Sequence, residues 1–416
     1  MHGASVLLVL LGGCGDGLVT VDGSVAPDGG GGLVSVRFLS DLSSLGGQTV
    51  YFQNADSSLV LAGRTSTDGR ANAFMAPGGI VTLAATRANL VALFTQFDVQ
   101  PGDEIVIDER TSTHDAPGTR LLVRVPRDPA STFYDLTTSC GSADIRGAET
   151  APVPISLSDC GDRADMLVRS FGDGIGYIYR DRVELQPGAT VTFAGPYRPF
   201  VTSTITATGI DPFVAKLNVV YALISGSREL HREDATIDPA TGMGSTSVQA
   251  PVPVDGLAMI RVDPSPSDAL AAHHVIEWGP SKQTNVVDVS ESLRPILERP
   301  RIDLAQQAVV WAESTTGAVS DAVLATFQWS PEGSFQNYQW TVVAPRTDEA
   351  ILRLPVLPRA ELVPQGVLIN PYIFATISSD GGYDRIRNRI LGAWSPGRMW
   401  PTDGTSGRVV YRDLGP

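Results

Sequence analysis

The sequence predicts an all-β protein built of tandem antiparallel β-sandwich domains with little helix. Short runs of β-branched and aromatic residues recur along the chain, separated by turn residues. Glycine and proline number 42 and 29 among the 416 residues, and most of this surplus is spread as turns. Helical periodicity is weak throughout. Many short strands joined by Gly/Pro turns are typical of sandwiches and barrels.

The bulk composition predicts several folded domains and excludes two classes of partner. A chain of 416 residues is too long for one ordinary domain, and its 43% of apolar residues suffices for real cores. The net charge of −14 argues against nucleic acid and against adhesion to anionic lipid through basic patches. We therefore expect no nucleic-acid partner.

The N-terminus carries the clearest motif. Residues 4–11 form an apolar run that is too short to span a bilayer, and it ends in Leu11-Gly12-Gly13-Cys14. This sequence resembles the lipobox of bacterial lipoproteins, which implies that 1–13 is a signal peptide and that Cys14 becomes the lipidated N-terminus. The departure is the n-region, where only His2 stands in place of the usual Lys or Arg. Whether Met1 is the true start stays open, and a buried strand with a chance cysteine is the alternative.

The segment after the lipobox reads as a tether. Residues 14–32 include a run of four glycines, which behaves as a flexible linker. In the enterobacterial lipoproteins that the motif resembles, Asp after the cysteine favours retention in the inner membrane, so the resemblance implies that Gly15 favours the outer membrane or cell surface. We expect a membrane partner only through the N-terminal lipid.

The other two cysteines are Cys140 and Cys160. A pair in an exported chain predicts a disulfide, which would add about 3 kcal/mol by restricting the unfolded chain. Free thiols, a metal site and a catalytic cysteine are the alternatives. The Cys-x₂-Cys spacing of metal sites is absent.

Four modules are predicted along the rest of the chain. Their spans are 33–115, 116–197 with the disulfide, 198–295, and 300–416, with a proline-flanked linker before the last. An internal echo supports this division, because the turn and strand at 77–84 recur in similar form at 187–194.

The first module resembles the transthyretin-like, carboxypeptidase-regulatory-like β-sandwich. The residues that carry the resemblance are 64–71, with the Thr67-Asp68-Gly69 turn, and the Pro77-Gly78 turn. The resemblance covers about 80 residues and implies a non-catalytic Ig-like or transthyretin-like sandwich.

Individual elements are also predicted. Asp68-Gly69 indicates a hairpin turn, because glycine tolerates the positive φ that such a turn needs. Trp329 and Trp340 are expected to be neighbours across a second hairpin. Only 293–297 and 385–391 are fair helix candidates.

Two histidine-containing segments are candidate metal or catalytic sites. In the run His273-His274-Val275-Ile276-Glu277, strand alternation puts His273 and Glu277 on one face and His274 on the other, so surface or edge residues are the favoured interpretation. His231 precedes acidic residues but is expected at a polar strand edge. The Gly-x-Ser-x-Gly, His-Glu-x-x-His, phosphate-loop and EF-hand motifs are absent. We predict no catalytic residues, no metal and no cofactor.

Two further groups of residues are candidate ligand sites. The Asp-Gly segments at 173–176 and 380–384 could offer oxygen ligands to Ca²⁺, although each supplies only one or two, and turns are favoured. Trp394, Trp400 and Tyr411, beside Met399, form a candidate platform for stacking on sugar rings. The same aromatics could instead plug the end of a sandwich.

Taken whole, the chain resembles uncharacterised lipoproteins of the myxobacterial type. The resemblance rests on the Cys14 motif, the Asp/Gly turns, and the matched Ser139-Cys140-Gly141 and Asp159-Cys160-Gly161 segments. The leading hypothesis is a non-enzymatic, lipid-anchored cell-envelope protein with a structural, adhesive or protein-interaction role, whose partner is an envelope protein or a glycan. The alternatives are a carbohydrate-binding lipoprotein and a hydrolase that places His231 or His273 in a cleft.

Overall fold

The computed structural model confirms the predicted fold class. Strands make up nearly all of its regular structure, and the one helix among the described residues is α1 (Gly382–Arg387). None of the described helices has the length and apolar character needed to cross a membrane. The structure describes residues 31–40, 43–109, 119–139, 141–146, 153–157, 163–172, 175–225, 228–251, 257–264, 272–331, 333, 335–359, 362–364, 367–387, 391–392 and 406–414.

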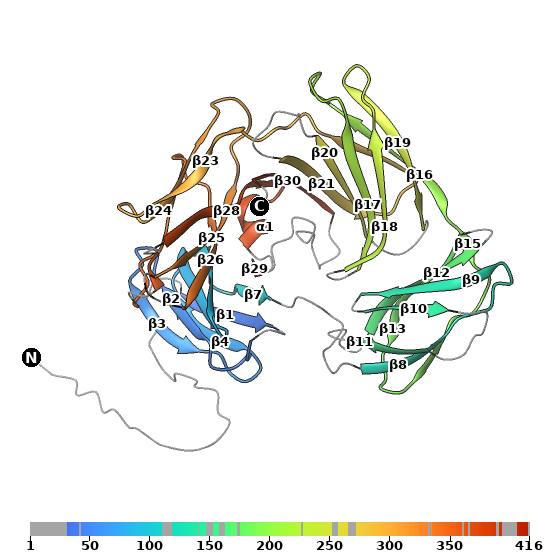
Figure 1. The fold of residues 1–416 in the computed structure, drawn as a ribbon, viewed down its shortest axis with the longest axis horizontal. Helices are drawn as coiled ribbons and strands as arrows, with labels where there is room; N and C mark the ends of the chain where they lie inside the picture. The colour runs from blue at the N-terminus through green and yellow to red at the C-terminus, as the bar shows by residue number, and fades with distance from the viewer. Residues whose placement is uncertain are drawn as a thin grey trace, which may run out of the picture.

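One twelve-stranded sheet forms the frame of the molecule. Its strands run in the spatial order β18-β17-β20-β21-β30-β28-β25-β26-β6-β5-β2-β3, and together they follow an arc (Figure 1). In chain order these are β2 (Thr49–Gln53), β3 (Leu59–Arg64), β5 (Gly79–Thr86), β6 (Leu90–Val99), β17 (Leu217–Ser225), β18 (Arg228–Ile237), β20 (Leu257–Pro264), β21 (Ala272–Pro280), β25 (Ala322–Ser330), β26 (Asn337–Pro345), β28 (Val367–Ser379) and β30 (Gly407–Leu414).

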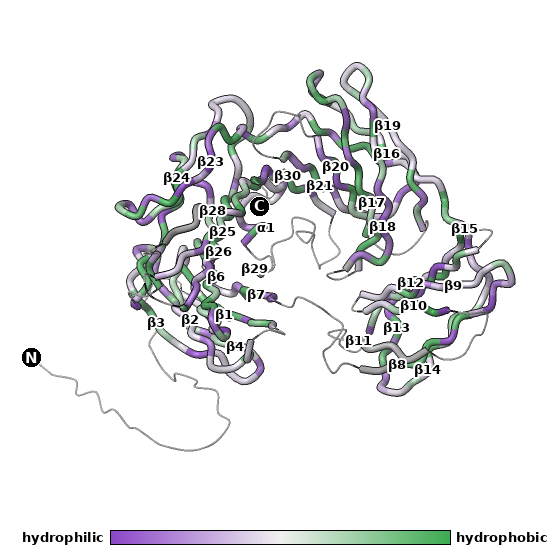
Figure 2. Tube along the Cα trace, viewed as in Figure 1, coloured by the Kyte–Doolittle hydropathy of each residue, from purple (hydrophilic) through white to green (hydrophobic). Residues whose placement is uncertain are grey.

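Three small sheets cover this frame. One face packs on a four-stranded sheet and on α1, and the opposite face packs on two three-stranded sheets. Both faces of the frame are therefore buried over most of its length, and β17 and β20 are hydrophobic along much of their course (Figure 2). The first covering sheet contains β1 (Gly32–Leu39), β4 (Arg70–Met75), β7 (Glu104–Asp108) and β29 (Leu391–Gly392). The other two contain β16 (Val201–Thr208), β19 (Met243–Ala250) and β22 (Thr284–Asp288), and β23 (Ile296–Asp303), β24 (Ala308–Glu313) and β27 (Ile351–Arg353).

The strands between 119 and 199 form a separate sandwich, which we call the second module. It has its own buried core, around Tyr134, Leu136 and Phe193. One sheet contains β9 (Ser131–Thr138), β10 (Ser142–Arg146), β12 (Arg163–Gly172), β13 (Gly176–Glu184) and β15 (Arg198–Pro199). The other contains β8 (Thr119–Arg124), β11 (Val153–Leu157) and β14 (Thr190–Thr192).

The four predicted module boundaries stay a prediction, but the sequence did not indicate how the modules join. β26 of the last stretch pairs in parallel with β6 of the first. The C-terminal strand β30 lies between β21 of the third stretch and β28 of the last. Three of the four predicted stretches therefore contribute strands to one sheet.

Local predictions met mixed outcomes. The Trp329–Trp340 hairpin is confirmed, because β25 and β26 pair antiparallel and place the two indole rings 6.1 Å apart. The helix expected at 385–391 forms slightly earlier, as α1. The helix expected at 293–297 was wrong: β23 begins at Ile296, and Leu293 bridges to Ala318.

The Asp68-Gly69 turn forms, but it does not make a hairpin. Gly69 has φ of +80°, as expected for such a turn. However, β3 pairs with β2 while β4 pairs with β1, in a different sheet. The turn therefore leads the chain from one layer of the first sandwich to the other, which short-range turn chemistry alone cannot distinguish from a hairpin.

Candidate functional site

An open groove runs along one edge of the second module. It has a volume of about 520 Å³. Its floor is β13, whose other edge pairs with β12 over most of its length. The lining residues come from β13 and from the segment that links β14 to β15: Tyr177, Ile178, Tyr179, Arg180, Thr192, Ala194, Gly195, Pro196 and Arg198.

The groove exists because the neighbouring strand stops early. β15 pairs with β13 only at Gly176 and Tyr177. The chain that leads into β15 turns at Gly195, where φ is +98°, and Pro196 follows. The edge of β13 beyond Tyr177 therefore has no paired strand among the described residues.

Two arginines give the groove a positive character in an acidic protein. The Arg180 Nη1 donates a hydrogen bond to the backbone oxygen of Thr192 at 3.1 Å, and its guanidinium lies 5.8 Å from the centre of the Phe193 ring. Both Arg180 and Arg198 are exposed. Within the described part of the chain, no carboxylate is paired with either of them, so both remain able to meet an anionic partner.

Tyr177 links the groove to an aromatic joint between the second module and the frame. Its ring is buried, and burial raises the pKa of its hydroxyl, an effect that the nearby Arg198 opposes. The ring of Phe200 lies 5.0 Å from that of Tyr177 and 5.0 Å from that of His231, on β18. The Ser225 hydroxyl also donates to Asp165 at 2.6 Å across this contact.

His231 was expected at a polar strand edge, and the structure corrects half of that prediction. β18 is an edge strand of the frame, but the imidazole is only 4% exposed. Its Nε2 lies 2.8 Å from the backbone oxygen of Gln249. Burial lowers its pKa to about 4, so it is neutral near pH 7.

The expectation that His273 and His274 lie at a surface or edge was wrong. β21 is an interior strand of the frame, and its alternation puts the two side chains on opposite faces as predicted. Burial lowers the pKa of His273 to about 3, with a further contribution from Arg412. His274 lies between Asp263 and Asp413 and stacks on Tyr411 at 4.4 Å. Neither His231 nor His273 lines the groove.

The proposed sugar platform loses one member. Tyr411 is 1% exposed and belongs to the buried core around α1, so it cannot stack on a ligand from solution. The sequence placed it in a tail, whereas β30 carries it into the centre of the frame. Trp394 and Trp400 lie outside the described residues, as do Cys14, Cys140 and Cys160.

The acidic turn at 380–384 serves as part of a packing joint. Asp380 pairs with Arg385 at 2.6 Å, and Asp384 pairs with Arg387. Both carboxylates are thus engaged by arginine. The other Ca²⁺ candidate lies partly outside the described residues, since Asp173 and Gly174 are not described.

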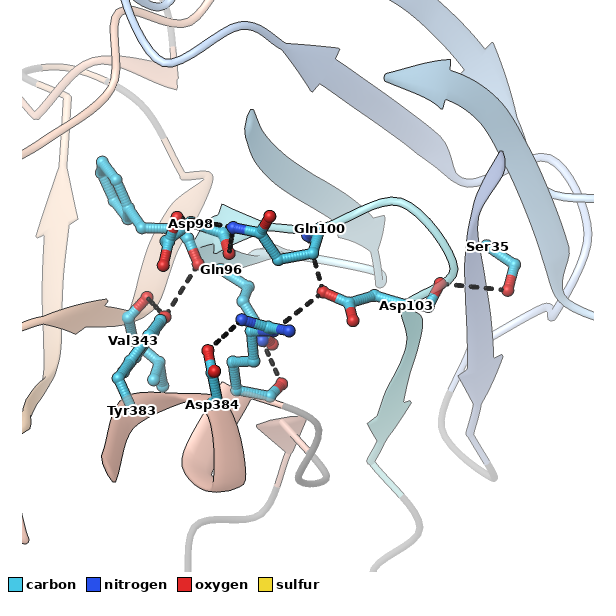
Figure 3. Close-up of polar contacts among 10 residues, drawn as sticks. Ser35, Gln96, Asp98, Gln100, Asp103, Val343, Tyr383 and Asp384 are labelled. Carbon is cyan, nitrogen blue, oxygen red and sulfur yellow. Dashed lines mark hydrogen bonds and ion pairs between the residues drawn. The ribbon is translucent and has the colours of Figure 1, made fainter. Parts of the chain in front are cut away.

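Helix α1 is held against the turn between β6 and β7 by polar contacts (Figure 3). The Tyr383 hydroxyl donates to the backbone oxygen of Phe97 at 2.8 Å. Arg387 Nε lies 3.1 Å from Asp103 Oδ2. Asp98 has a φ of +53° at an irregularity in β6, and burial raises its pKa. Because Tyr383 contacts Phe97 and Arg387 contacts Asp103, this cluster joins the first and last stretches.

The groove residues were missed by sequence analysis. The run Tyr177-Ile178-Tyr179 was predicted only as a strand, which is correct. Alternating tyrosines followed by Arg180 were the available signal. How much of the β13 edge is covered depends on where β15 begins, at Arg198, and short-range patterns do not carry that information.

Comparisons with known proteins give only low-scoring likenesses to solved structures. No family model matches the chain, and no curated protein does. The Bacillus anthracis TIE protein matches with 12% identity and a TM-score of 0.16 over 62% of this chain, which spans half of that protein. The major pilin subunit BcpA of Bacillus cereus matches with 10% identity and a TM-score of 0.16, over 62% of this chain and 98% of that one. A Streptococcal ancillary pilin matches at 10% identity and a TM-score of 0.17, with the same coverage.

Proposed function

We propose that this chain is a non-enzymatic, lipid-anchored cell-envelope protein that acts as a structural or adhesive module through protein contacts. The observation that carries the proposal is the edge of β13 beyond Tyr177, which no strand of the described residues covers, with its flanking arginines. An open sheet edge can accept an extended segment of another protein by main-chain hydrogen bonds. Around it, the large frame is buried on both faces, as suits a scaffold.

The lipid anchor is proposed from the Leu11-Gly12-Gly13-Cys14 motif. The test is metabolic labelling with radioactive palmitate in a bacterial host, comparing the wild-type chain with Cys14→Ser. The expected result is label on the wild type and none on the variant. Protease shaving of intact cells then reports whether the body is displayed at the surface. Equal labelling of both chains would reject the anchor.

The interaction role is tested with the fragment from Gly15 as bait on envelope fractions. Arg180→Glu/Arg198→Glu should lose a specific partner. Arg299→Glu/Arg353→Glu is the matched control, because both of its arginines are exposed and lie outside the groove. Equal capture by both variants would exclude the groove as the contact surface.

The carbohydrate-binding alternative now depends on Trp394 and Trp400 alone. A glycan array with wild type and Trp394→Ala/Trp400→Ala tests it. Loss of a specific sugar signal in the variant would favour that alternative over the protein-interaction role.

A further inference from the structure

We infer that the groove on β13 receives residues 16–22 of a second copy of this chain as an added strand. The inference deepens the proposed interaction role and rests on it, but it does not depend on lipid attachment at Cys14. The occupant is thus an acidic, extended segment of the protein itself.

The open window on β13 is short and well defined. It begins after Tyr177, the last residue that β15 covers. It ends at Arg182, where φ is +44° and the backbone amide turns back to donate to Asp165 Oδ1 at 2.8 Å. Over the described part of the chain, the four residues from Ile178 to Asp181 therefore have no strand on this edge and remain to pair with an incoming one. The β12–β13 pairing is irregular next to Arg182. This irregularity and the nearby charges also limit uncontrolled pairing at the edge.

The chemistry of the window favours an anionic strand. Arg198 is the first residue of β15 and lies opposite Tyr177, and Arg180 lies within the window, with neither held by a carboxylate among the described residues. Tyr179 is partly buried and contributes an aromatic wall. A strand that carried acids at its ends would gain charge-assisted hydrogen bonds in addition to main-chain pairing.

The chain contains such a segment before its first described residue. Residues 18–21 read Leu-Val-Thr-Val, a four-residue run with high β-propensity, and Asp16 and Asp22 flank it. The run matches the length of the window, and Asp16 and Asp22 are opposite in charge to the two arginines. This run follows the lipobox motif in the sequence, so it would remain in the chain after cleavage before Cys14.

A second copy fits better than the same copy. The described chain begins beside β1, at Gly31. In Figure 1, β1 and β13 belong to opposite arms of the arc. Exchange between copies would link neighbouring molecules head to tail.

The test compares two soluble fragments, 15–416 and 31–416, by size-exclusion chromatography with light scattering. We expect 15–416 to form concentration-dependent oligomers and 31–416 to be monomeric. A fluorescent peptide of residues 15–24 should bind 31–416 with 1:1 stoichiometry, and Arg180→Glu/Arg198→Glu should weaken it by about tenfold or more. The Arg299→Glu/Arg353→Glu control should bind like wild type. A peptide with Thr20→Pro should not bind, since proline removes a backbone donor.

Exchanging the charges of peptide and groove shows whether a loss of binding comes from lost charge pairing or from misfolding of the variant. The Asp16→Arg/Asp22→Arg peptide should recover affinity for the Arg180→Glu/Arg198→Glu fragment. Failure of the wild-type peptide to bind 31–416 overturns the inference. So does a monomeric 15–416 whose own segment fills the groove, because the proposed donor is a second copy. Neither outcome alters the palmitate labelling at Cys14, so failure here is distinct from failure of the lipid anchor.

Discussion

His274 and Asp413 join two strands that lie far apart in the sequence. The His274 Nε2 is 3.1 Å from Oδ1 of Asp413 on the C-terminal strand β30, while its Nδ1 is 2.7 Å from Asp263 Oδ1 on β20. Burial alone would lower the pKa of His274, but hydrogen bonds and charges from the two carboxylates outweigh it and raise the pKa to about 8. The protonated imidazole therefore bridges three adjacent strands of the frame.

This arrangement predicts a stability that falls at alkaline pH. The folded-state pKa lies above the unfolded value of about 6.5, so the stabilisation is fully present below pH 6.5 and is lost as the pH rises through 8. The difference amounts to ~2 kcal/mol. Thermal unfolding from pH 6 to 9 should show this loss in the wild type and a flatter profile in His274→Gln. Parallel profiles for the two proteins would contradict the bridge.

His231 predicts the opposite pH response. Burial depresses its folded-state pKa to about 4, so its contribution is present above pH 6.5 and is lost as the pH falls towards 4. The shift corresponds to ~3 kcal/mol. His231→Phe should lose the contact with Gln249 at neutral pH, yet lose less stability than wild type between pH 7 and 4.5. Circular dichroism melts across that range measure it, and an acid response identical to wild type would be evidence against a buried neutral imidazole.

Gly69 is expected to tolerate no side chain. Its φ is +80°, and an added Cβ would lie 2.2 Å from the backbone oxygen of Phe38, which belongs to β1. Gly47 is the matched control, because its φ is +83° but no atom lies within 4 Å of its Cβ position. Gly47→Ala should cost about 1 kcal/mol through backbone strain, and Gly69→Ala should cost clearly more. Denaturant midpoints that shift equally would show that the close approach to Phe38 is absent.

Trp340 is expected to stabilise the pairing of β26, in the last stretch, with β6, in the first stretch. Its Nε1 donates to Thr95 Oγ1 on β6 at 2.8 Å, and its ring packs with Phe327 and Trp329 in a fully buried group. Trp340→Ala should destabilise by about 3–5 kcal/mol. Trp340→Phe keeps most of the packing and should lose mainly the hydrogen bond, about 1 kcal/mol. Limited proteolysis gives an independent measure of whether β6 and β26 come apart in the Trp340→Ala variant.

The sequence determined the local chemistry of this protein. Alternating apolar residues on β12 and β16, and the turn at Gly69, follow from side-chain period and backbone sterics, which act over a few residues. The buried hairpin of Trp329 and Trp340 could be predicted for the same reason.

Only the tertiary structure decided how the strands were assigned to sheets. The pairing of β26 with β6, and the insertion of β30 between β21 and β28, join segments far apart along the chain. These pairings buried Tyr411 and His273, which looked exposed in sequence. In the second module, the position of β15 leaves the edge of β13 beyond Tyr177 without a partner strand among the described residues. Main-chain hydrogen bonding is nearly independent of side-chain identity. A sequence therefore indicates where a strand forms, but it carries much less information about which other strand that strand pairs with.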